Sequence, residues 1–460
     1  MIHTFTVNGV SIALDIFSGA VHVADPVSLE AIRLYETHSR NEVIKEMLRR
    51  YERNPEVDPR TLSVLMDQLD ELVRAGQLYS SDVYLNTCIP SSNTKPLIKA
   101  LCLHVAHVCN LACSYCFAGQ GKYQGQAAMM SLSTAREALD FLVANSGTRR
   151  HLEVDFFGGE PLLNWEVVKE TVAYGRALER KHNKVFRFTL TTNGVLLDEE
   201  MMEFCNQEMQ NVVLSLDGRQ EVHDHYRIDA KGKGSYETIV PKFQEFVRRR
   251  GEKGYYIRGT FTRRNLDFLQ DILHMADLGF TQLSMEPVVT APDDPEALRA
   301  EDLPMLFEQY ERLAQEMLDR KRQGRGFEFY HYILDLENGP CIHKRLNGCG
   351  SGTEYLAVTP QGDLYPCHQF VGDSAYVIGT LKQGINNHAL RERFAENTLY
   401  SRPECRNCWA QLYCAGGCAA NAAHATGSIS GVYSYGCELF KKRIECALML
   451  QACLQEEGLA

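Results

Sequence analysis

The chain has 460 residues, 45% of them hydrophobic and 23% charged, which is the composition of a globular protein. A net charge of −11 at pH 7 argues against nucleic acid or an anionic membrane as a partner. The first residues lack the features of a signal peptide, and no apolar run reaches the about 18 residues that a membrane-spanning helix needs. The expected protein is soluble and cytoplasmic, with about two to four domains.

Residues 1–80 are predicted to form a small module of their own. Alternating apolar and polar residues around the turn signal Asn8-Gly9 predict short antiparallel strands at its start. Three helical patterns follow, at residues 28–37, 40–52 and 59–76. A few strands followed by three helices resemble a winged helix. Residues 81–98 are predicted to be a linker.

Strand-like and helix-like patterns alternate from residue 99 to residue 300. Apolar runs predict strands at 100–105, 152–157, 185–191, 211–216, 255–262 and 281–286. Amphipathic patterns predict helices at 132–145, 164–182, 198–208, 235–250 and 265–278. Six such repeats predict an α/β fold with a partial (β/α)6 barrel, like a TIM barrel left open. Such barrels carry their chemistry at the C-terminal ends of the strands.

The last third of the chain is predicted to have two parts. Residues 301–340 contain a bridging helix at about 302–322, and residues 341–460 are rich in cysteine and end in a helix at 437–456. Of the sixteen cysteines in the chain, nine lie between Cys341 and Cys446. In a reducing cytoplasm, dense cysteine indicates metal or redox chemistry more often than disulfides.

Directly after the first predicted barrel strand, Cys109, Cys113 and Cys116 are spaced C-x3-C-x2-C. Three thiolates are one short of a four-cysteine shell, so they suit a [4Fe–4S] cluster with one iron open to another ligand. The alternatives are buried reduced thiols or a partial zinc site. Three further motifs follow the next strands, "GGEP" at 158–161, "TTNG" at 191–194 and "SLDG" at 215–218. Their convergence on one edge of the sheet predicts a site there.

The cysteine motif followed by Gly-Gly-Glu-Pro resembles the radical S-adenosylmethionine (SAM) enzymes. In that family the open iron binds SAM, whose reductive cleavage yields a 5′-deoxyadenosyl radical that abstracts a substrate hydrogen. The resemblance implies that Gly158, Gly159 and Glu160 receive the methionine amino group of SAM. It implies further cofactor contacts by Tyr115, Thr192, Asn193, Ser215 and Arg227, with Ser215 on the ribose or carboxylate and Arg227 on the carboxylate. For Tyr115, which would screen the cluster from water, ordinary loop packing is the alternative.

The cysteines of the C-terminal region resemble the SPASM extension of radical SAM peptide-modifying enzymes, which binds two auxiliary [4Fe–4S] clusters. Taken alone, they would better suit a zinc ribbon. The resemblance assigns the outer cluster to Cys405, Cys408, Cys414 and Cys437. It assigns the inner cluster to Cys349, Cys367 and Cys418. The expected cofactors are therefore SAM and three [4Fe–4S] clusters.

Two residues of this region are candidates for catalysis. Cys341 is either the fourth ligand of the inner cluster, or that position is vacant and awaits a substrate thiolate. His368 follows Cys367, where sulfatase-maturing relatives carry an aspartate general base. It is either a proton acceptor near neutrality or, as we favour, a polar residue behind the ligands. The cysteines without ligand spacing are expected to be buried thiols: Cys88, Cys102, Cys205, Cys446 and Cys453.

Over nearly its whole length the chain most resembles the maturases of SCIFF peptides (six cysteines in forty-five residues), notably in "CGSGTEYLAVTPQGDLYPCHQFVGD". The resemblance implies thioether cross-linking of a cysteine-rich ribosomal precursor peptide, with a peptide cysteine sulfur bonding to a threonine side chain. The N-terminal module would bind the leader of the precursor by β-augmentation, or would only cap the barrel. The electron donor would be a flavodoxin or ferredoxin.

Two alternatives stay open. One is a related maturase that forms carbon–carbon cross-links or oxidises cysteine or serine as sulfatase maturases do. The other, from a different class, is a zinc-dependent, non-catalytic peptide-binding protein.

Overall fold

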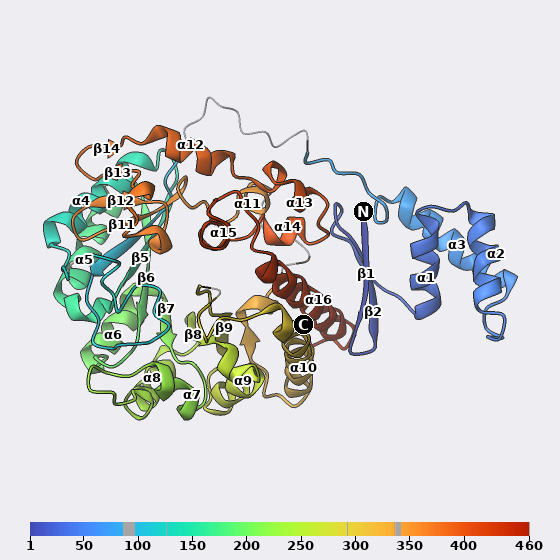
Figure 1. Cartoon of the computed structure of the whole chain (residues 1–460), viewed down its shortest axis with the longest axis horizontal. Helices are drawn as coiled ribbons and strands as arrows, with labels where there is room; N and C mark the ends of the chain where they lie inside the picture. Colours follow the sequence, from blue (N-terminus) through green and yellow to red (C-terminus); the bar gives the residue numbers. More distant parts are fainter. Residues whose placement is uncertain (86–96, 126, 292, 335, 337–341, 460) are drawn as a thin grey trace.

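The computed structural model describes residues 1–85, 97–125, 127–291, 293–334, 336 and 342–459. Its main sheet has the strand order β10-β9-β8-β7-β6-β5-β4-β11-β12-β13-β14, so β10 and β14 are the open ends. Strands β4 to β9 are parallel and curve into an arc with helices on its outer side (Figure 1). The α/β class is confirmed, and the barrel is partial because the sheet does not close.

The six predicted barrel strands all occur, with bounds within two residues of those expected. They are β4 (Ala100–Ala106), β5 (His151–Gly158), β6 (Val185–Thr192), β7 (Met209–Ser215), β8 (Tyr255–Phe261) and β9 (Gln282–Pro287). The helices between them are α4 (Leu132–Asn145), α5 (Trp165–His182), α6 (Glu199–Glu208), α7 (Gln220–Tyr226), α8 (Tyr236–Arg250) and α9 (Phe268–Asp277). Only α7 has no counterpart among the predicted helices, because its seven residues are too few for a clear period.

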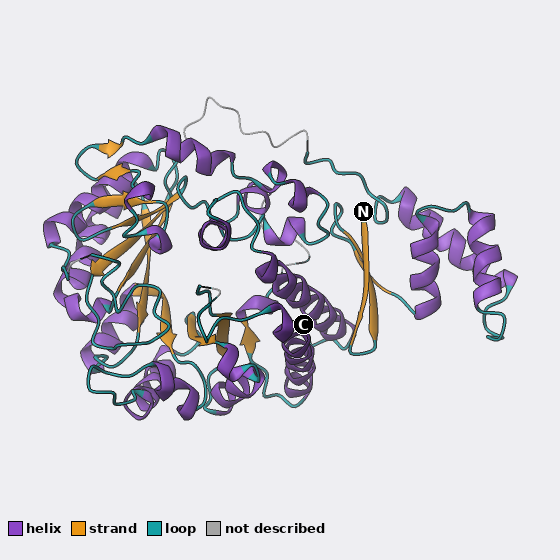
Figure 2. Ribbon diagram, viewed as in Figure 1, coloured by secondary structure: helices purple, strands orange, loops and turns teal. Residues whose placement is uncertain are grey.

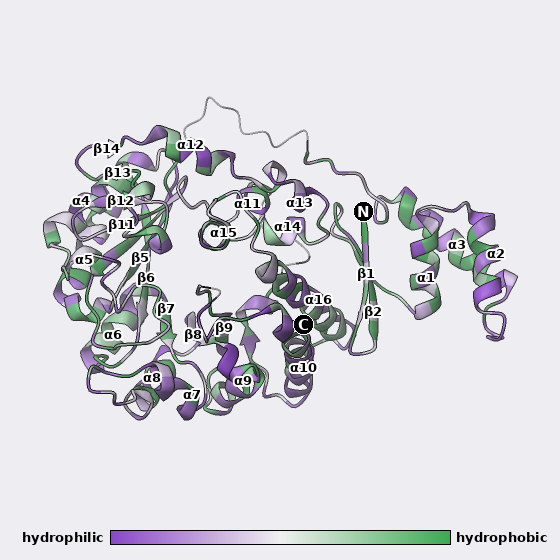
Figure 3. Cartoon of the chain, viewed as in Figure 1, coloured by the Kyte–Doolittle hydropathy of each residue, from purple (hydrophilic) through white to green (hydrophobic). Residues whose placement is uncertain are grey.

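Each barrel strand buries one face against the helices and turns the other to the inside of the arc. In β6 every second residue is buried, and Phe188 from that set lies so close to Gly175 of α5 that a Cβ there would approach its ring to 2.6 Å. The same alternation in β8 buries Ile257 and leaves Arg258 exposed on the opposite face. We call that opposite side the concave face of the sheet. Figure 3 shows the hydrophobic colour along the central strands.

The cysteine-rich region continues the barrel sheet. Strand β11 (Tyr355–Val358) pairs in parallel with β4, and β12 (Asp363–Tyr365), β13 (Gly379–Thr380) and β14 (Gly384–Ile385) follow in antiparallel order. Short helices complete the region: α11 (Ile342–Asn347), α12 (His388–Glu396), α13 (Pro403–Arg406), α14 (Gln411–Cys414) and α15 (Ala419–Thr426). The last helix, α16 (Ser434–Glu456), packs on the bridging helix α10 (Leu303–Arg322), after which β10 (Glu328–Phe329) pairs with β9.

The N-terminal residues form a three-stranded antiparallel sheet followed by three helices. The strands are β1 (Ile2–Val7), β2 (Val10–Asp15) and β3 (Val21–Val23), and the helices are α1 (Pro26–Tyr35), α2 (Arg40–Arg50) and α3 (Pro59–Arg74). Phe5 and Ile12, partners across β1 and β2, pack into the main core, whereas Ala13 packs with the three helices. The small sheet thus lies between these helices and the rest of the molecule (Figure 2). None of the helices in the described ranges has the length and apolar character needed to cross a membrane.

Candidate active site

The three cysteines of the barrel lie in the loop that follows β4. Cys109, Cys113 and Cys116 are half-buried, and the backbone N–H of Leu111 and the side-chain amide of Asn193 donate to Cys109 Sγ at 3.4 and 3.7 Å. Burial raises the pKa of Cys109 to about 12 and that of Cys113 to about 11. A thiol with such a pKa becomes a thiolate when a metal displaces its proton.

The three thiols lie close together. After the larger effect of burial, the negative charges of Cys113 and Cys116 add to the rise in the pKa of Cys109. No group of three or more cysteine, histidine or acidic side chains in the described residues is arranged around a single metal ion. A [4Fe–4S] cluster takes one thiolate per iron, so it requires thiols around a cube and not around a point. Three thiols on one loop, Cys109, Cys113 and Cys116, are the donor set that such a cluster with one open iron would take.

Gly158 and Gly159 let the end of β5 pass directly under the cysteine loop. Their backbones are so close to it that a Cβ would approach Ala106 O to 2.3 Å and Val108 O to 2.1 Å. The N–H groups of Gly159 and Glu160 donate to these same two carbonyl oxygens at 2.7 and 2.9 Å. The two glycines thus have a packing role, and their contact with the methionine amino group stays a prediction.

Glu160 joins the ends of β5 and β6. Its buried carboxylate accepts hydrogen bonds from the Leu162 N–H at 3.0 Å, from Thr192 Oγ1 at 2.7 Å and from the Asn193 N–H at 2.8 Å. Burial raises the pKa of Glu160 to about 7. The predicted residues Thr192 and Asn193 therefore lie where the sequence pattern expected them, at the strand ends beside the cysteines.

Arg227 is a buried cation beside the cysteine loop. Its guanidinium donates two hydrogen bonds to the fully buried Asp217, at 2.9 and 3.0 Å, and lies 5.7 Å from the ring centre of Tyr115. Tyr115 Oη donates to the same carboxylate at 2.5 Å. Burial would raise the pKa of Asp217, but Arg227 outweighs it and holds that pKa below its ordinary value. Two of the five N–H donors of Arg227 are thus occupied, and its predicted contact with SAM would use the others.

Sequence reasoning missed Asp217, although it lies in the quoted motif "SLDG" two residues after Ser215. Its carboxylate also accepts the Thr260 N–H at 2.9 Å, so it links β7, β8 and the residue that follows α7. The missed signal was an acidic residue at a strand end. Sequence reasoning also missed His104 and His107, whose buried ring nitrogens lie 3.1 Å apart.

The C-terminal cysteines fall into two groups. Burial raises the pKa of Cys367 to about 12, and the nearby thiols of Cys418 and Cys349 add to that rise. Burial likewise raises the pKa of Cys414 to about 12, with additions from a second set of neighbouring thiols: Cys437, Cys405 and Cys408. The two groups have the membership that the inner and outer clusters require, and the clusters themselves stay predicted.

Cys341 and Cys88 lie outside the described residues. The other cysteines without ligand spacing are buried free thiols: Cys102, Cys205, Cys446 and Cys453. The hypothesis that Cys341 is a ligand therefore stays open.

His368 brings the inner cysteine group close to the barrel cysteines. Its ring lies 5.0 Å from that of Phe157, at the end of β5, and 5.7 Å from that of Phe117, which follows Cys116. Burial lowers the pKa of His368 to about 4, so the ring is neutral at pH 7. This favours the interpretation of His368 as a polar residue behind the ligands.

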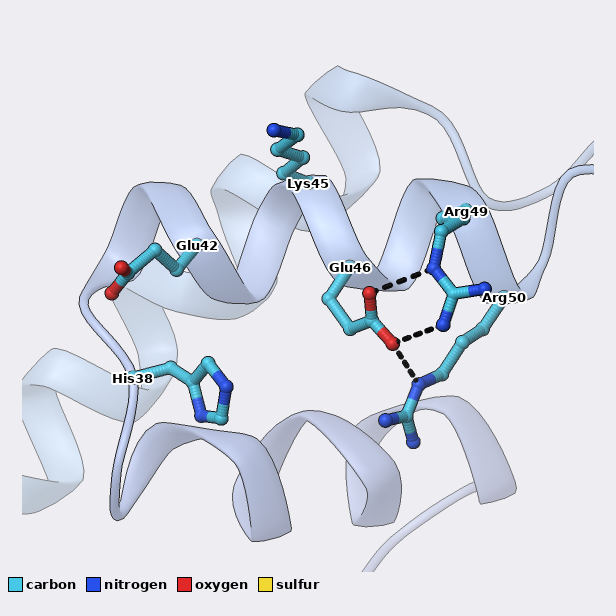
Figure 4. Close-up of a pocket in the computed structure, with 6 residues that line it drawn as sticks. All are labelled: His38, Glu42, Lys45, Glu46, Arg49 and Arg50. Atoms are coloured by element: carbon cyan, nitrogen blue, oxygen red, sulfur yellow. Dashed lines mark hydrogen bonds and ion pairs between the residues drawn. The ribbon is translucent and has the colours of Figure 1, made fainter.

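A surface depression far from these cysteines is not a competing site. It lies on α2 in the N-terminal module (Figure 4), and Glu46 accepts hydrogen bonds there from Arg49 and Arg50. Of its other charged groups, Glu42 accepts hydrogen bonds from Ser39, and Arg50 also pairs with Glu30.

Comparison with known proteins agrees with this geometry. The Radical SAM superfamily model matches residues 103–275, and the model of the SPASM iron–sulfur cluster-binding domain matches residues 349–409. A cysteine-type anaerobic sulfatase-maturating enzyme of Clostridium novyi (strain NT) is 26% identical over 358 residues, which cover 73% of this chain and 91% of that enzyme.

Two solved structures share the fold. Native anSMEcpe with bound AdoMet superposes with a TM-score of 0.64 at 20% identity, covering 78% of this chain and 99% of that one. Streptococcus suis SuiB bound to S-adenosylmethionine superposes with a TM-score of 0.51 at 16% identity, covering 94% of this chain and 97% of that one. The chain therefore carries a radical SAM domain at residues 103–275 and, after it, an SPASM iron–sulfur cluster-binding domain at residues 349–409.

Proposed function

We propose that the chain is a radical SAM peptide maturase that forms thioether cross-links between cysteine sulfur and a threonine side chain of a ribosomal precursor peptide. The observation that carries the proposal is the contact of His368 with Phe117 and Phe157. These contacts join the residue after Cys367 to the residue after Cys116, so the inner cysteine group lies beside the cysteine loop of the barrel. A peptide held between them would meet the radical source on one side and a thiolate-binding site on the other.

The residues of the barrel edge would hold the cofactor. Cys109, Cys113 and Cys116 would bind the first cluster, and the remaining donors of Arg227 would take the SAM carboxylate. When bound, SAM and three [4Fe–4S] clusters would supply the 5′-deoxyadenosyl radical and take up the electron left after the carbon–sulfur bond forms. Tyr115 contacts both Asp217 and Arg227, and it would screen the loop from water.

The inner cysteine group would receive the peptide sulfur. Cys349, Cys367 and Cys418 provide three thiolates among the described residues. The fourth position would belong to Cys341 or to the cysteine of the substrate. The second arrangement would hold the reacting sulfur as a thiolate close to the barrel.

The N-terminal module would bind the leader of the precursor along β3. The Ala24 N–H donates to the Ser11 carbonyl of β2, and the Ala20 carbonyl accepts from the Asp15 N–H of β2. In the alternating antiparallel pattern, Val21 and Val23 therefore point their N–H groups to the open edge of the sheet. No strand of the described ranges pairs with that edge, so it could accept a strand of the peptide. The likeness to SuiB supports this role, since 94% coverage requires part of residues 1–98, and SuiB has also been solved bound to its precursor peptide SuiA.

The test is to produce the chain without oxygen together with a cysteine-containing precursor encoded beside it, and to weigh the product. A thioether removes two hydrogen atoms and makes the cysteine resistant to alkylation. Loss of two hydrogen atoms with every cysteine still alkylated would indicate a carbon–carbon cross-link instead. The Cys116→Ala variant is the control and should leave the precursor unchanged.

A further inference from the structure

A second group of charged side chains lies on the concave face, between the barrel strands β8 and β9 and the helices that follow them in the chain. Arg258 is in β8, Glu286 is in β9, His331 is in a short helix at Tyr330–Tyr332, and Arg443 is in α16. These four residues come from three different parts of the chain. They meet between the barrel strands and the last helix.

Glu286, His331 and Arg443 form a connected set. The carboxylate of Glu286 lies 3.3 Å from His331 Nε2 and 3.7 Å from a guanidinium nitrogen of Arg443. Burial lowers the pKa of His331 to about 4, so its ring is neutral and accepts from Arg443 at 3.4 Å. Arg443 also donates to Tyr310 Oη at 3.0 Å. A further nitrogen of Arg443 is buried without a hydrogen-bond partner in the part of the chain that is described.

Arg258 stands apart from this set. Within the described ranges its guanidinium makes no ion pair within 4.0 Å and no hydrogen bond, and its side chain is exposed on the concave face. Its strand partners are Ser215 on one side and Ser284 on the other. Its strand partner Ser215 is a predicted SAM contact, and its positive charge acts on Glu286 and on His368, the residue after Cys367. Arg258 therefore lies between the predicted SAM site and the inner cysteine group.

The charges of this group do not balance. Two guanidinium groups face a single carboxylate, and His331 is neutral, so one positive charge is left over. A lysine ammonium would act as a point charge, but a guanidinium offers a planar pair of donors that matches a carboxylate. The free donors of Arg258 lie where the peptide of the proposed reaction would have to be.

We propose that Arg258 binds a carboxylate of the peptide substrate and so sets the position of the peptide under SAM. The carboxylate belongs to an Asp or Glu side chain beside the modified residues or to the C-terminus of the peptide. The inference rests on the proposed function, because it assumes that a peptide occupies the concave face. It adds a specificity for acidic peptides to that function.

The test measures how fast phenylglyoxal modifies Arg258 in the reconstituted, oxygen-free full chain with saturating SAM. Three probes are compared: acetyl-Gly-Glu-Gly-amide, acetyl-Gly-Gln-Gly-amide, and acetyl-Gly-Gln-Gly with a free C-terminal carboxylate. Mass mapping reports each arginine separately. Arg187 is the internal control because it is exposed on the same face of β6, near the opposite end of the barrel.

One or both carboxylate probes should slow modification of Arg258 about tenfold at saturation, whereas the neutral probe and Arg187 should show no effect. The probe that protects identifies the source of the carboxylate. Equal protection by all three probes, protection by none, or complete protection by SAM alone would overturn the proposal. The probes require no turnover, so the result stands or falls separately from the thioether product.

A variant tests whether the binding of the carboxylate probe changes in the expected direction. Glu286→Gln removes the carboxylate that faces Arg258, so half-protection should need several-fold less of the carboxylate probe. A requirement for more probe than the unaltered chain needs would contradict the role of Arg258.

Discussion

The two cysteine regions of the molecule are held in place by different means. The barrel loop is fixed by side chains from several strand ends, with Asn193 on Cys109 and the Tyr115–Asp217–Arg227 set beside Cys113. The outer cysteine group lies instead on α13 and α14, each of four residues, on the loop between them and on the first turn of α16. Directly after Cys414 the backbone runs through three left-handed residues, Ala415 to Gly417.

This contrast indicates where the metal contributes to folding. Isolated four-residue helices have little stability of their own. Parallel strands joined by buried hydrogen bonds and ion pairs are stable without a cofactor. When a site is not preformed, the binding free energy of the metal becomes folding free energy. The outer group should therefore depend on its proposed cluster for structure, and the barrel loop should depend on its proposed cluster for chemistry.

The largest expected effect comes from removing the barrel thiols. The combined variant Cys109→Ala, Cys113→Ala and Cys116→Ala should lose all cleavage of SAM to 5′-deoxyadenosine, because no thiolate remains to hold the first cluster. Hydrogen exchange of the barrel strands should change little. Formation of 5′-deoxyadenosine by this variant would refute the assignment of the cofactor site.

The opposite pattern is expected for the outer group. Cys408→Ala should lose about four irons per chain. It should keep some SAM cleavage that is not coupled to product, and it should lose hydrogen-exchange protection at 403–418. If that segment stays protected after the variant has lost these four irons, the contrast between the two regions is wrong.

Breaking the ion pair of Asp217 and Arg227 tests how much it contributes to the unfolding free energy of the chain. Asp217→Asn leaves the guanidinium buried without its charge partner, which should cost about 3–5 kcal/mol of unfolding free energy. Urea unfolding of metal-free protein measures this loss. Glu457→Gln, at the exposed pair with Arg322, is the matched control and should leave the unfolding free energy nearly unchanged. Equal effects of the two substitutions would argue against the buried pair.

The pKa of Glu160 predicts a pH dependence. A carboxyl group whose pKa rises from 4.5 to about 7 on folding binds its proton more tightly in the folded chain. Its contribution to stability is present below pH 4.5 and disappears as the pH rises through 7, a change of about 3 kcal/mol. Unfolding of metal-free protein between pH 4.5 and 7.5 should show this decline relative to Glu160→Gln. Parallel pH profiles of the two proteins would contradict it.

The smallest effect concerns the N-terminal module, apart from both cysteine regions. Val23→Pro removes an N–H from the open edge of β3 and should weaken binding of the full precursor about tenfold. SAM cleavage without peptide should stay the same. Val23→Thr keeps the N–H and serves as control. Unchanged affinity of the proline variant would count against leader binding at this edge.

Long periodic segments were predictable from the sequence, and short or paired features were not. The strands β4 to β9 and the helices α4 and α10 have bounds close to those expected, because six or more residues of one pattern outweigh local exceptions. Strands β11 to β14 have two to four residues each, too few for any period, so the extension of the barrel sheet was missed.

The predicted site residues gather on one edge because parallel strands end together, which topology alone requires. The side chains that these residues bind could not be predicted from the sequence. Arg227 was expected to serve SAM only, yet α7 turns the chain back and places its guanidinium on Asp217. Such a pairing depends on tertiary contacts and leaves no mark in the spacing of residues.

The most direct test of the central claim is the iron and sulfide content of the chain reconstituted without oxygen, measured together with 5′-deoxyadenosine formed from SAM and a reductant. About twelve irons and twelve sulfides per chain with SAM cleavage are expected for three four-iron clusters. About four irons per chain would mean that the chain holds a single four-iron cluster and no auxiliary clusters. Zinc in place of iron, with no cleavage, would contradict the enzyme itself.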